Sequence, residues 1–186
     1  MRNVNHLIEI NNTLPKKNAF NRYYMKKLTI IRHAKSSWEG NHRDFDRPLS
    51  DRGINDLSNM VKEVKTFGYK PDLVLSSPAN RAFTTAKSFV AALSIKEDKF
   101  VTNEDLYDFS GQSLIATIKN VKDSVNHLMV FGHNHALTYF VNLYGNIPIS
   151  NVPTCGLVTI EFDINRWKDI NKGITTKTLF PKNIRD

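Results

Sequence analysis

Two arginines and two histidines of this chain lie just after the ends of short apolar runs. They are Arg32 and His33 after the run 28–31, Arg81 one helical turn beyond the run 73–76, and His133 after the run 128–131. Phosphoryl transfer needs a positioned nucleophile and fixed positive charge around the phosphoryl oxygens. A guanidinium fits two oxygens at once, and a neutral imidazole is a capable nucleophile near neutral pH. These residue types predict a phosphate site in which His33 attacks and the other three side chains hold the anion.

This chemistry sets requirements for the two histidines. One ring nitrogen of His33 has to be unprotonated, and a hydrogen bond from the other ring N–H to a backbone carbonyl would fix that tautomer. His133 is expected to act as a cation beside the transferring group. Helices that begin after Ser77 and after His133 would add backbone N–H donors to the anion site.

The elements that must position these side chains follow from the hydrophobic pattern. Apolar residues at helical spacing predict a helix from Ser50, as N-cap, to Gly68, one that begins with Ser77-Pro78, one capped by Ser110, and one that ends at Gly145. The predicted strands are 28–31, 72–76, 127–131, 157–162 and 174–180, with a short one near 100–101. Strands that alternate with helices indicate a three-layer α/β/α sandwich with a mostly parallel sheet. Ligands of such sheets bind beyond the carboxyl ends of the strands, which would bring the four residues together.

Length and composition limit the alternatives. A chain of 186 residues fits one domain, and 40% apolar with 24% charged residues fits a soluble globular protein. The formal net charge of +8 suits an anionic substrate or a nucleic acid equally well. A basic stripe with interleaved aromatic residues is not identifiable, so no nucleic-acid partner is expected. The single Cys155 and the absence of an apolar membrane span favour a cytoplasmic protein without a membrane partner.

The first 24 residues differ from the rest. They are rich in Asn and lack a sustained period, and Met25-Lys26-Lys27 resembles a translation start. We therefore expect 1–24 to be a disordered N-terminal extension and 25–186 to form a single domain.

Ordered motifs make the chain resemble the histidine phosphatase superfamily, which has the phosphoglycerate mutase-like fold. The segments that carry the resemblance are Arg-His-Ala-Lys-Ser-Ser-Trp (32–38), Asp-Arg-Pro-Leu-Ser-Asp-Arg-Gly (46–53), Ser-Ser-Pro-Ala-Asn-Arg-Ala (76–82), Gly-His-Asn (132–134) and Pro-Thr-Cys-Gly (153–156). Ala34 stands where the wider superfamily has glycine, which favours the SixA-type branch of phosphohistidine phosphatases over mutases. The resemblance implies that His33 becomes phosphorylated and that Arg32, Arg81 and His133 hold the phosphate. Lys35, Ser36 and Asn134 are candidates for substrate binding, and a plain loop role for Lys35 and Ser36 stays open.

The general acid is less defined. Mutases and acid phosphatases of the superfamily protonate an alkoxide leaving group with a carboxylate in the loop after the third strand. Asp108 or Glu104 could serve here, although the reading of both as solvated loop carboxylates is favoured. A phosphoramidate such as phosphohistidine needs less help from an acid, because its nitrogen can be protonated beforehand.

The sequence thus predicts a monomeric, metal-independent and cofactor-independent phosphatase that forms a phosphohistidine intermediate. Its substrate would be a phosphorylated histidine of a protein or a small phosphoester. The alternative is a non-catalytic module on the same fold that binds a phosphorylated ligand.

Overall fold

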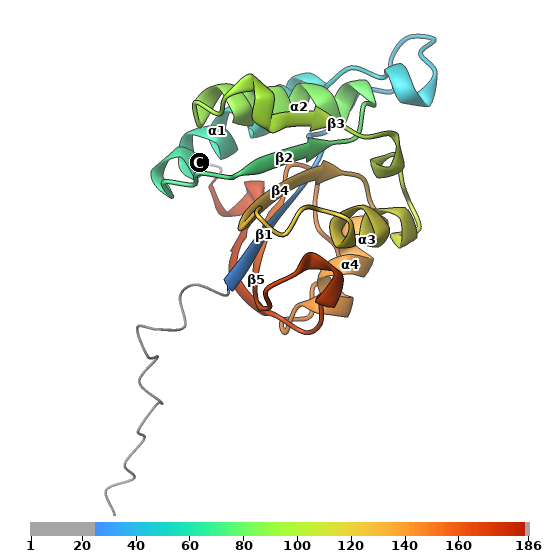
Figure 1. Ribbon diagram of the computed structural model, residues 1–186. Helices are drawn as coiled ribbons and strands as arrows, with labels where there is room; N and C mark the ends of the chain where they lie inside the picture. The colour runs from blue at the N-terminus through green and yellow to red at the C-terminus, as the bar shows by residue number, and fades with distance from the viewer. Residues whose placement is uncertain (1–24, 185–186) are drawn as a thin grey trace, which may run out of the picture.

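A six-stranded sheet runs through the computed structural model, which describes residues 25–184 (Figure 1). Its strands are β1 (Met25–Arg32), β2 (Leu73–Ser76), β3 (Phe100–Thr102), β4 (His127–Gly132), β5 (Leu157–Asp163) and β6 (Ile174–Leu179), in the order β3-β2-β4-β1-β5-β6. The pairs β1–β4, β4–β2 and β2–β3 are parallel, and β5 and β6 add an antiparallel edge. The mostly parallel sheet predicted from the sequence is therefore confirmed.

Helices cover both faces of this sheet. Figure 1 shows α1 (Asp51–Thr66) and α2 (Asn80–Ala92) on one face, and α3 (Gln112–Lys119) and α4 (Ala136–Tyr144) on the other. Each face has its own apolar core. Met60 and Phe89 pack with Ile31 on the α1/α2 side, whereas Leu137 packs with Ile30 on the α3/α4 side. Successive residues of a strand point to opposite faces, so β1 contributes to both cores and the three-layer sandwich is confirmed.

The helix starts were predicted with unequal success. Ser50 caps α1 as expected, and its Oγ accepts a hydrogen bond from the Gly53 N–H at 3.2 Å. The prediction for the next helix is wrong by two residues, because α2 begins at Asn80 and Ala79 is its N-cap. Ser77 lies before the helix. Its Oγ accepts a hydrogen bond from the Ala79 N–H at 3.3 Å and lies 2.8 Å from His133 Nε2. The Oγ of Ser77 is therefore engaged by the chain before the helix and by His133 rather than by the first turn of α2.

The prediction for the first 24 residues lies beyond the described residues. The N-terminal extension 1–24 is outside them, so the expectation of disorder stays a prediction. Within residues 25–184, no helix has the length and apolar character that crossing a membrane requires.

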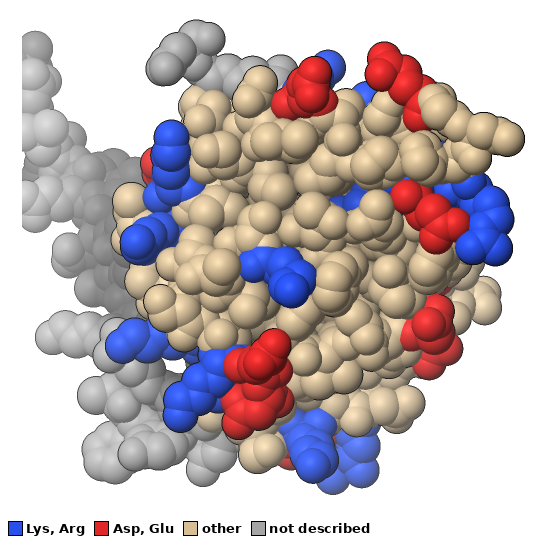
Figure 2. All heavy atoms as spheres, turned by 90° about the horizontal axis from the view of Figure 1, so that it is seen from above, with Lys and Arg blue, Asp and Glu red and all other residues tan. Residues whose placement is uncertain are grey.

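Figure 2 shows the surface as seen from above the view of Figure 1. On this face Lys and Arg side chains lie singly or in small groups, one near the centre and the others toward the edge, with Asp and Glu among those at the edge. They do not form the continuous basic stripe that binding along a nucleic acid backbone requires.

Candidate active site

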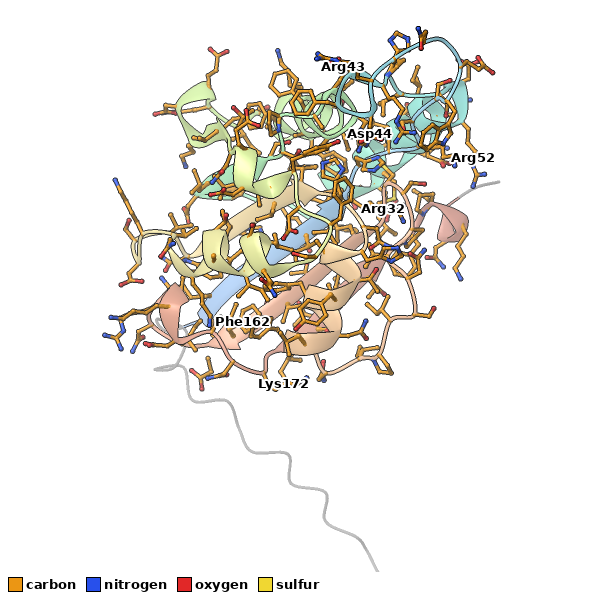
Figure 3. The ribbon with its side chains drawn as sticks, turned by 90° about the vertical axis from the view of Figure 1, so that its right-hand side faces the viewer. Arg32, Arg43, Asp44, Arg52, Phe162 and Lys172 are labelled. Carbon is orange, nitrogen blue, oxygen red and sulfur yellow. The ribbon has the colours of Figure 1, made fainter. Side chains whose placement is uncertain are left out.

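An open cavity of about 440 Å³ lies beyond the carboxyl ends of the parallel strands. Its positively charged wall consists of Arg32, Lys35, Arg47 and Arg81. Figure 3 shows Arg32 and Asp44 near one end of the sheet, whereas Phe162 and Lys172 lie at the other. The register agrees, because Phe162 pairs with Lys26 at the start of β1 and Arg32 ends the same strand.

His33 follows β1 directly and is almost completely buried. Its backbone N–H donates to the Gly132 carbonyl, which extends the β1–β4 pairing by one residue. The ring Nδ1 lies 2.7 Å from the Ala34 carbonyl oxygen. A carbonyl can only accept, so Nδ1 carries the proton and Nε2 keeps a free electron pair. The hydrogen bond expected from the sequence is therefore present.

The surroundings of His33 keep its ring neutral. Burial lowers the pKa of His33 well below its ordinary value, and His133, Arg81 and Arg32 add to the effect against the hydrogen bond to Ala34. A neutral imidazole with Nε2 unprotonated is the form that can attack phosphorus. The positive charge of the pocket thus favours the unprotonated ring of His33.

Arg32 and Arg81 supply guanidinium groups from two different elements. Arg32 ends β1, and its Nη1 donates to the Val152 carbonyl at 2.9 Å. Arg81 lies in the first turn of α2, and its Nη2 lies 2.9 Å from a carboxylate oxygen of Asp44. The Nε atoms of both are buried without a hydrogen-bond partner. Buried unpaired N–H donors carry an energetic cost that a bound anion would remove.

His133 follows β4 and is also buried. Its ring centroid lies 5.1 Å from that of His33, and its Nε2 lies 2.8 Å from Ser77 Oγ. Burial and the charge of Arg81 lower the pKa of His133 to about 3. This corrects the expectation of a cation: in the ligand-free pocket His133 is neutral.

The three candidate substrate-binding residues all line the cavity. Lys35 is exposed, and Ser36 is buried in a bridge with Leu49. The side chain of Asn134 is engaged at both ends, since its Nδ2 donates to Asn151 at 2.7 Å and its Oδ1 accepts from Thr138 Oγ1 at 2.6 Å. Asn134 therefore joins the start of α4 to the following loop at the cavity edge.

The two candidate acids lie elsewhere. Glu104 is an exposed residue of a 3-10 turn outside the cavity wall. Asp108 accepts hydrogen bonds from the N–H groups of Ser110, Gly111 and Leu114 at 2.7, 2.9 and 3.0 Å, so it caps α3. Burial alone would raise the pKa of Asp108, but these bonds outweigh it and lower the pKa. An ionised carboxylate held by three backbone N–H groups is a poor proton donor. Glu104 is exposed, as the favoured reading of a solvated carboxylate predicts, whereas Asp108 is buried and hydrogen-bonded.

Sequence reasoning did not identify the part played by the loop at 44–47. Asp44 Oδ1 lies 3.1 Å from Arg47 Nη2, and Asp44 Oδ2 accepts from Tyr107 Oη at 2.5 Å. The Arg47 guanidinium also stacks on Trp38, with 3.5 Å from Cζ to the ring centroid. The high density of charged residues in the segment 44–47 indicates that it forms ion pairs. The sequence does not show that this segment folds back onto Arg81.

Metal binding by clustered side chains has no basis in the part of the chain that the structure describes. Among residues 25–184, no group of three or more His, Cys, Asp or Glu side chains is arranged to hold a metal ion.

The buried Cys155 has its pKa raised by burial and by Asp56, as expected of an unreactive thiol.

Known proteins resemble this chain in sequence and in fold. An uncharacterised chloroplastic protein of Arabidopsis thaliana is 27% identical over 157 residues, which cover 77% of this chain and 70% of that protein. The structure of the protein histidine phosphatase SixA complexed with tungstate matches with a TM-score of 0.73 and 20% identity, covering 86% of this chain and 99% of SixA. Phosphoglycerate mutase from Bacillus anthracis matches with a TM-score of 0.59 and 14% identity over 87% of this chain and 95% of the mutase. The fold is therefore phosphoglycerate mutase-like.

Membership of a family rests on the sequence itself. The profile of the histidine phosphatase superfamily (branch 1) matches residues 28–123, slightly more than half of the chain, and includes Arg32, His33 and Arg81. With these residues gathered around one cavity, this chain belongs to branch 1 of the histidine phosphatase superfamily.

Proposed function

We propose that this protein is a phosphatase that removes phosphate from phosphohistidine on a protein, through a phosphorylated His33. The observation that carries the proposal is the state of the His33 ring: Nδ1 is bound to a carbonyl, and Nε2 is free and unprotonated at a cavity lined by guanidinium groups. That arrangement supplies the nucleophile and the positive charge that phosphoryl transfer needs.

In the first step, Nε2 of His33 forms a bond to phosphorus while the bond from phosphorus to the substrate nitrogen breaks. The departing imidazole of the substrate leaves neutral, because it takes a proton from solvent before or during cleavage. Arg32 and Arg81 balance the charge of the transferring group. In the second step, water attacks the phosphorus of phosphorylated His33, releases orthophosphate and restores the neutral ring.

The carboxylate on the cavity wall favours a nitrogen leaving group. Partial burial would raise the pKa of Asp44, but hydrogen bonds from Tyr107 and Arg81 outweigh it, and the pKa is lowered. Asp44 is therefore ionised and unsuited to protonate an alkoxide. An imidazole leaving group does not need that proton from the enzyme.

Two further features support a protein substrate. The cavity is open rather than enclosed, and Trp38 and Phe109 on its wall are exposed large apolar residues that a protein partner could cover. SixA, which shares this fold, is a protein histidine phosphatase, and it was solved with tungstate, a tetrahedral oxyanion similar in shape to phosphate.

The proposal is tested by trapping the intermediate. A protein labelled with 32P on histidine is mixed with the enzyme, quenched at alkaline pH and mapped; the label should appear on His33. His33→Ala should abolish labelling and turnover, whereas His42→Ala, at an exposed histidine of the neighbouring loop, should retain both. Label on another residue, or turnover by His33→Ala, would overturn the mechanism.

The substrate class is tested separately. Phosphohistidine protein, an aryl phosphate and an alkyl phosphate are compared at equal enzyme concentration. We expect kcat/KM to be highest for phosphohistidine protein and lowest for the alkyl phosphate, whose leaving group needs an acid. A preference for the alkyl phosphate would contradict a nitrogen leaving group, and binding without turnover of any of the three would favour the non-catalytic module.

A further inference from the structure

The carboxylate of Asp44 occupies the donor groups that an incoming anion would use. Arg81 donates through Nη1 to the Asp44 backbone carbonyl and through Nη2 to Asp44 Oδ2, so one residue engages both arms of its fork. Asp44 Oδ1 lies 3.1 Å from Arg47 Nη2, and Tyr107 Oη donates to Oδ2 at 2.5 Å. The pocket thus contains one anionic group of its own.

The charges around this contact are unequal. Among the described residues that line the cavity, Asp44 is the one acidic side chain, against Arg32, Lys35, Arg47 and Arg81. The side chains of Arg47 and Arg81 are buried, at 9% and 2% exposed, whereas that of Asp44 is 44% exposed. Of the three groups, the carboxylate is the one with open space through which to move.

We propose that Asp44 is an internal competitor for orthophosphate: its carboxylate holds Arg81 and Arg47 in the empty pocket and returns to them as the product leaves. This inference rests on the proposed function for its catalytic consequence. A site with four cationic side chains around a dianion would bind the product tightly and release it slowly. An ionised carboxylate that satisfies the same donors lowers the net gain of phosphate binding, since the anion has to replace existing charged hydrogen bonds.

The direct test is calorimetric binding of orthophosphate to three purified proteins: wild type, Asp44→Asn and Asp46→Asn. Asp46 is the matched control, because it lies on the same 3-10 turn and pairs with the exposed Arg43 at 2.9 Å. We expect Asp44→Asn to bind orthophosphate at least about tenfold more tightly, as the loss of a charge-assisted competing bond implies. Asp46→Asn should change the Kd by less than about twofold.

A second variant tests the competition without changing a charge. Tyr107→Phe removes one donor that holds Asp44, so it should tighten phosphate binding about two- to fivefold in the wild-type background. In the Asp44→Asn background it should have no further effect, because the competitor is already disabled.

The outcomes separate this inference from its rivals. Unchanged or weaker phosphate binding by Asp44→Asn overturns it, as does an equal effect of Asp46→Asn, which would indicate only a change in overall charge. Weaker binding by Tyr107→Phe in both backgrounds would also overturn it and would assign Tyr107 as a phosphate donor. Because binding is measured without turnover, a failed phosphatase assay leaves this result readable. If turnover is present, the orthophosphate Ki of Asp44→Asn should fall in parallel with its Kd.

Discussion

The rings of His33 and His133 lie with their centroids 5.1 Å apart and their planes at 51°. Two imidazolium cations at this separation, with Arg32 and Arg81 beside them, would repel one another strongly. The protein avoids this cost by keeping both rings neutral, and burial is the largest cause of the lowered pKa of each. Burial, more than the proximity of the two rings, therefore keeps both imidazoles neutral.

The rate at which the substrate phosphorylates His33 should decline little in mild acid. An imidazole with the ordinary pKa of about 6.5 would lose roughly 90% of its neutral form by pH 5.5. Because the pKa of His33 lies well below its ordinary value, its neutral form should remain dominant there. We expect the single-turnover rate of phosphoenzyme formation to fall by less than about twofold between pH 7.5 and 5.5, since protonation of the leaving imidazole can only raise it. A decline with a midpoint near 6.5, matched by a ring 15N titration of His33, would contradict this prediction.

Phosphate binding should raise the pKa of His133. Burial and Arg81 lower that pKa to about 3 in the empty pocket, so the ring is neutral at pH 5. A bound dianion favours the cation, and the pKa rises as a consequence. NMR titration of the His133 ring with and without orthophosphate should show an upward shift of at least about one unit. Only a midpoint raised to about 7 or above would make His133 the cation expected from the sequence when phosphate is bound, and an unchanged midpoint would exclude that role.

Contacts between residues close together in the sequence could be predicted, whereas contacts between distant residues could not. Ser50 was identified as a cap because its partner, the Gly53 N–H, lies three residues away. The predicted helix start at Ser77 is wrong, and the Oγ of Ser77 contacts His133, which lies 56 residues away. Asp108 was considered as an acid, although its local contacts to 110–114 could have suggested a cap.

The same contrast holds for the site. Strand ends could be predicted from apolar runs, and parallel strands bring their ends together, which accounts for the position of Arg32 and His33 at one cavity. The contact of Asp44 with Arg81 spans 37 residues and depends on the path of an irregular loop. No periodic pattern encodes such a path, so the position of Asp44 on the cavity wall could not be predicted from the sequence.

Gly53→Ala should be destabilising although Gly53 lies within a helix. Alanine ordinarily stabilises a helix interior by up to about 1 kcal/mol relative to glycine. Here a Cβ would lie 2.0 Å from the Lys35 carbonyl oxygen, which also accepts from the Ser50 N–H at 2.9 Å. We expect the free energy of unfolding to fall by about 2 kcal/mol and orthophosphate binding to weaken, because Lys35 and Ser36 must move. Urea denaturation and calorimetry measure both effects.

The control for this change is Ser58→Ala, an exposed position on the same helix. It should leave phosphate binding unchanged and the free energy of unfolding within about 0.5 kcal/mol. A Gly53→Ala protein as stable as this control would show that the helix and the loop at 35 can separate without cost.

Asp108→Ala should affect stability more than chemistry. The carboxylate accepts from three backbone N–H groups and from Ser110 Oγ at 2.8 Å, and its removal leaves the start of α3 without these bonds. We expect the free energy of unfolding to fall by about 1–3 kcal/mol. At a temperature where the variant is folded, the pH dependence of kcat/KM should match that of wild type. A missing limb of the pH profile would instead identify Asp108 as a proton donor.

His127 should make the protein less stable as the pH falls, at a position remote from the active site. Its Nε2 lies 3.0 Å from Thr29 Oγ1, and its ring meets Tyr69 edge-on at 5.2 Å between centroids. Burial and the charge of Lys27 lower the pKa of His127 to about 4. Between pH 6.5 and 4 the unfolded chain therefore binds a proton that the native protein does not, and the free energy of unfolding declines as pH falls through this window.

His127→Gln removes that titration and keeps a polar group for Thr29. The other acidic and basic groups are common to both proteins, so the difference between their stabilities isolates the effect of His127. Urea denaturation at pH 7, 5.5 and 4.5 should show the wild type losing about 2 kcal/mol more than the variant over this range. Parallel stability curves would mean that the native protein can protonate the ring without cost, and that burial against Thr29 and Tyr69 does not keep His127 neutral.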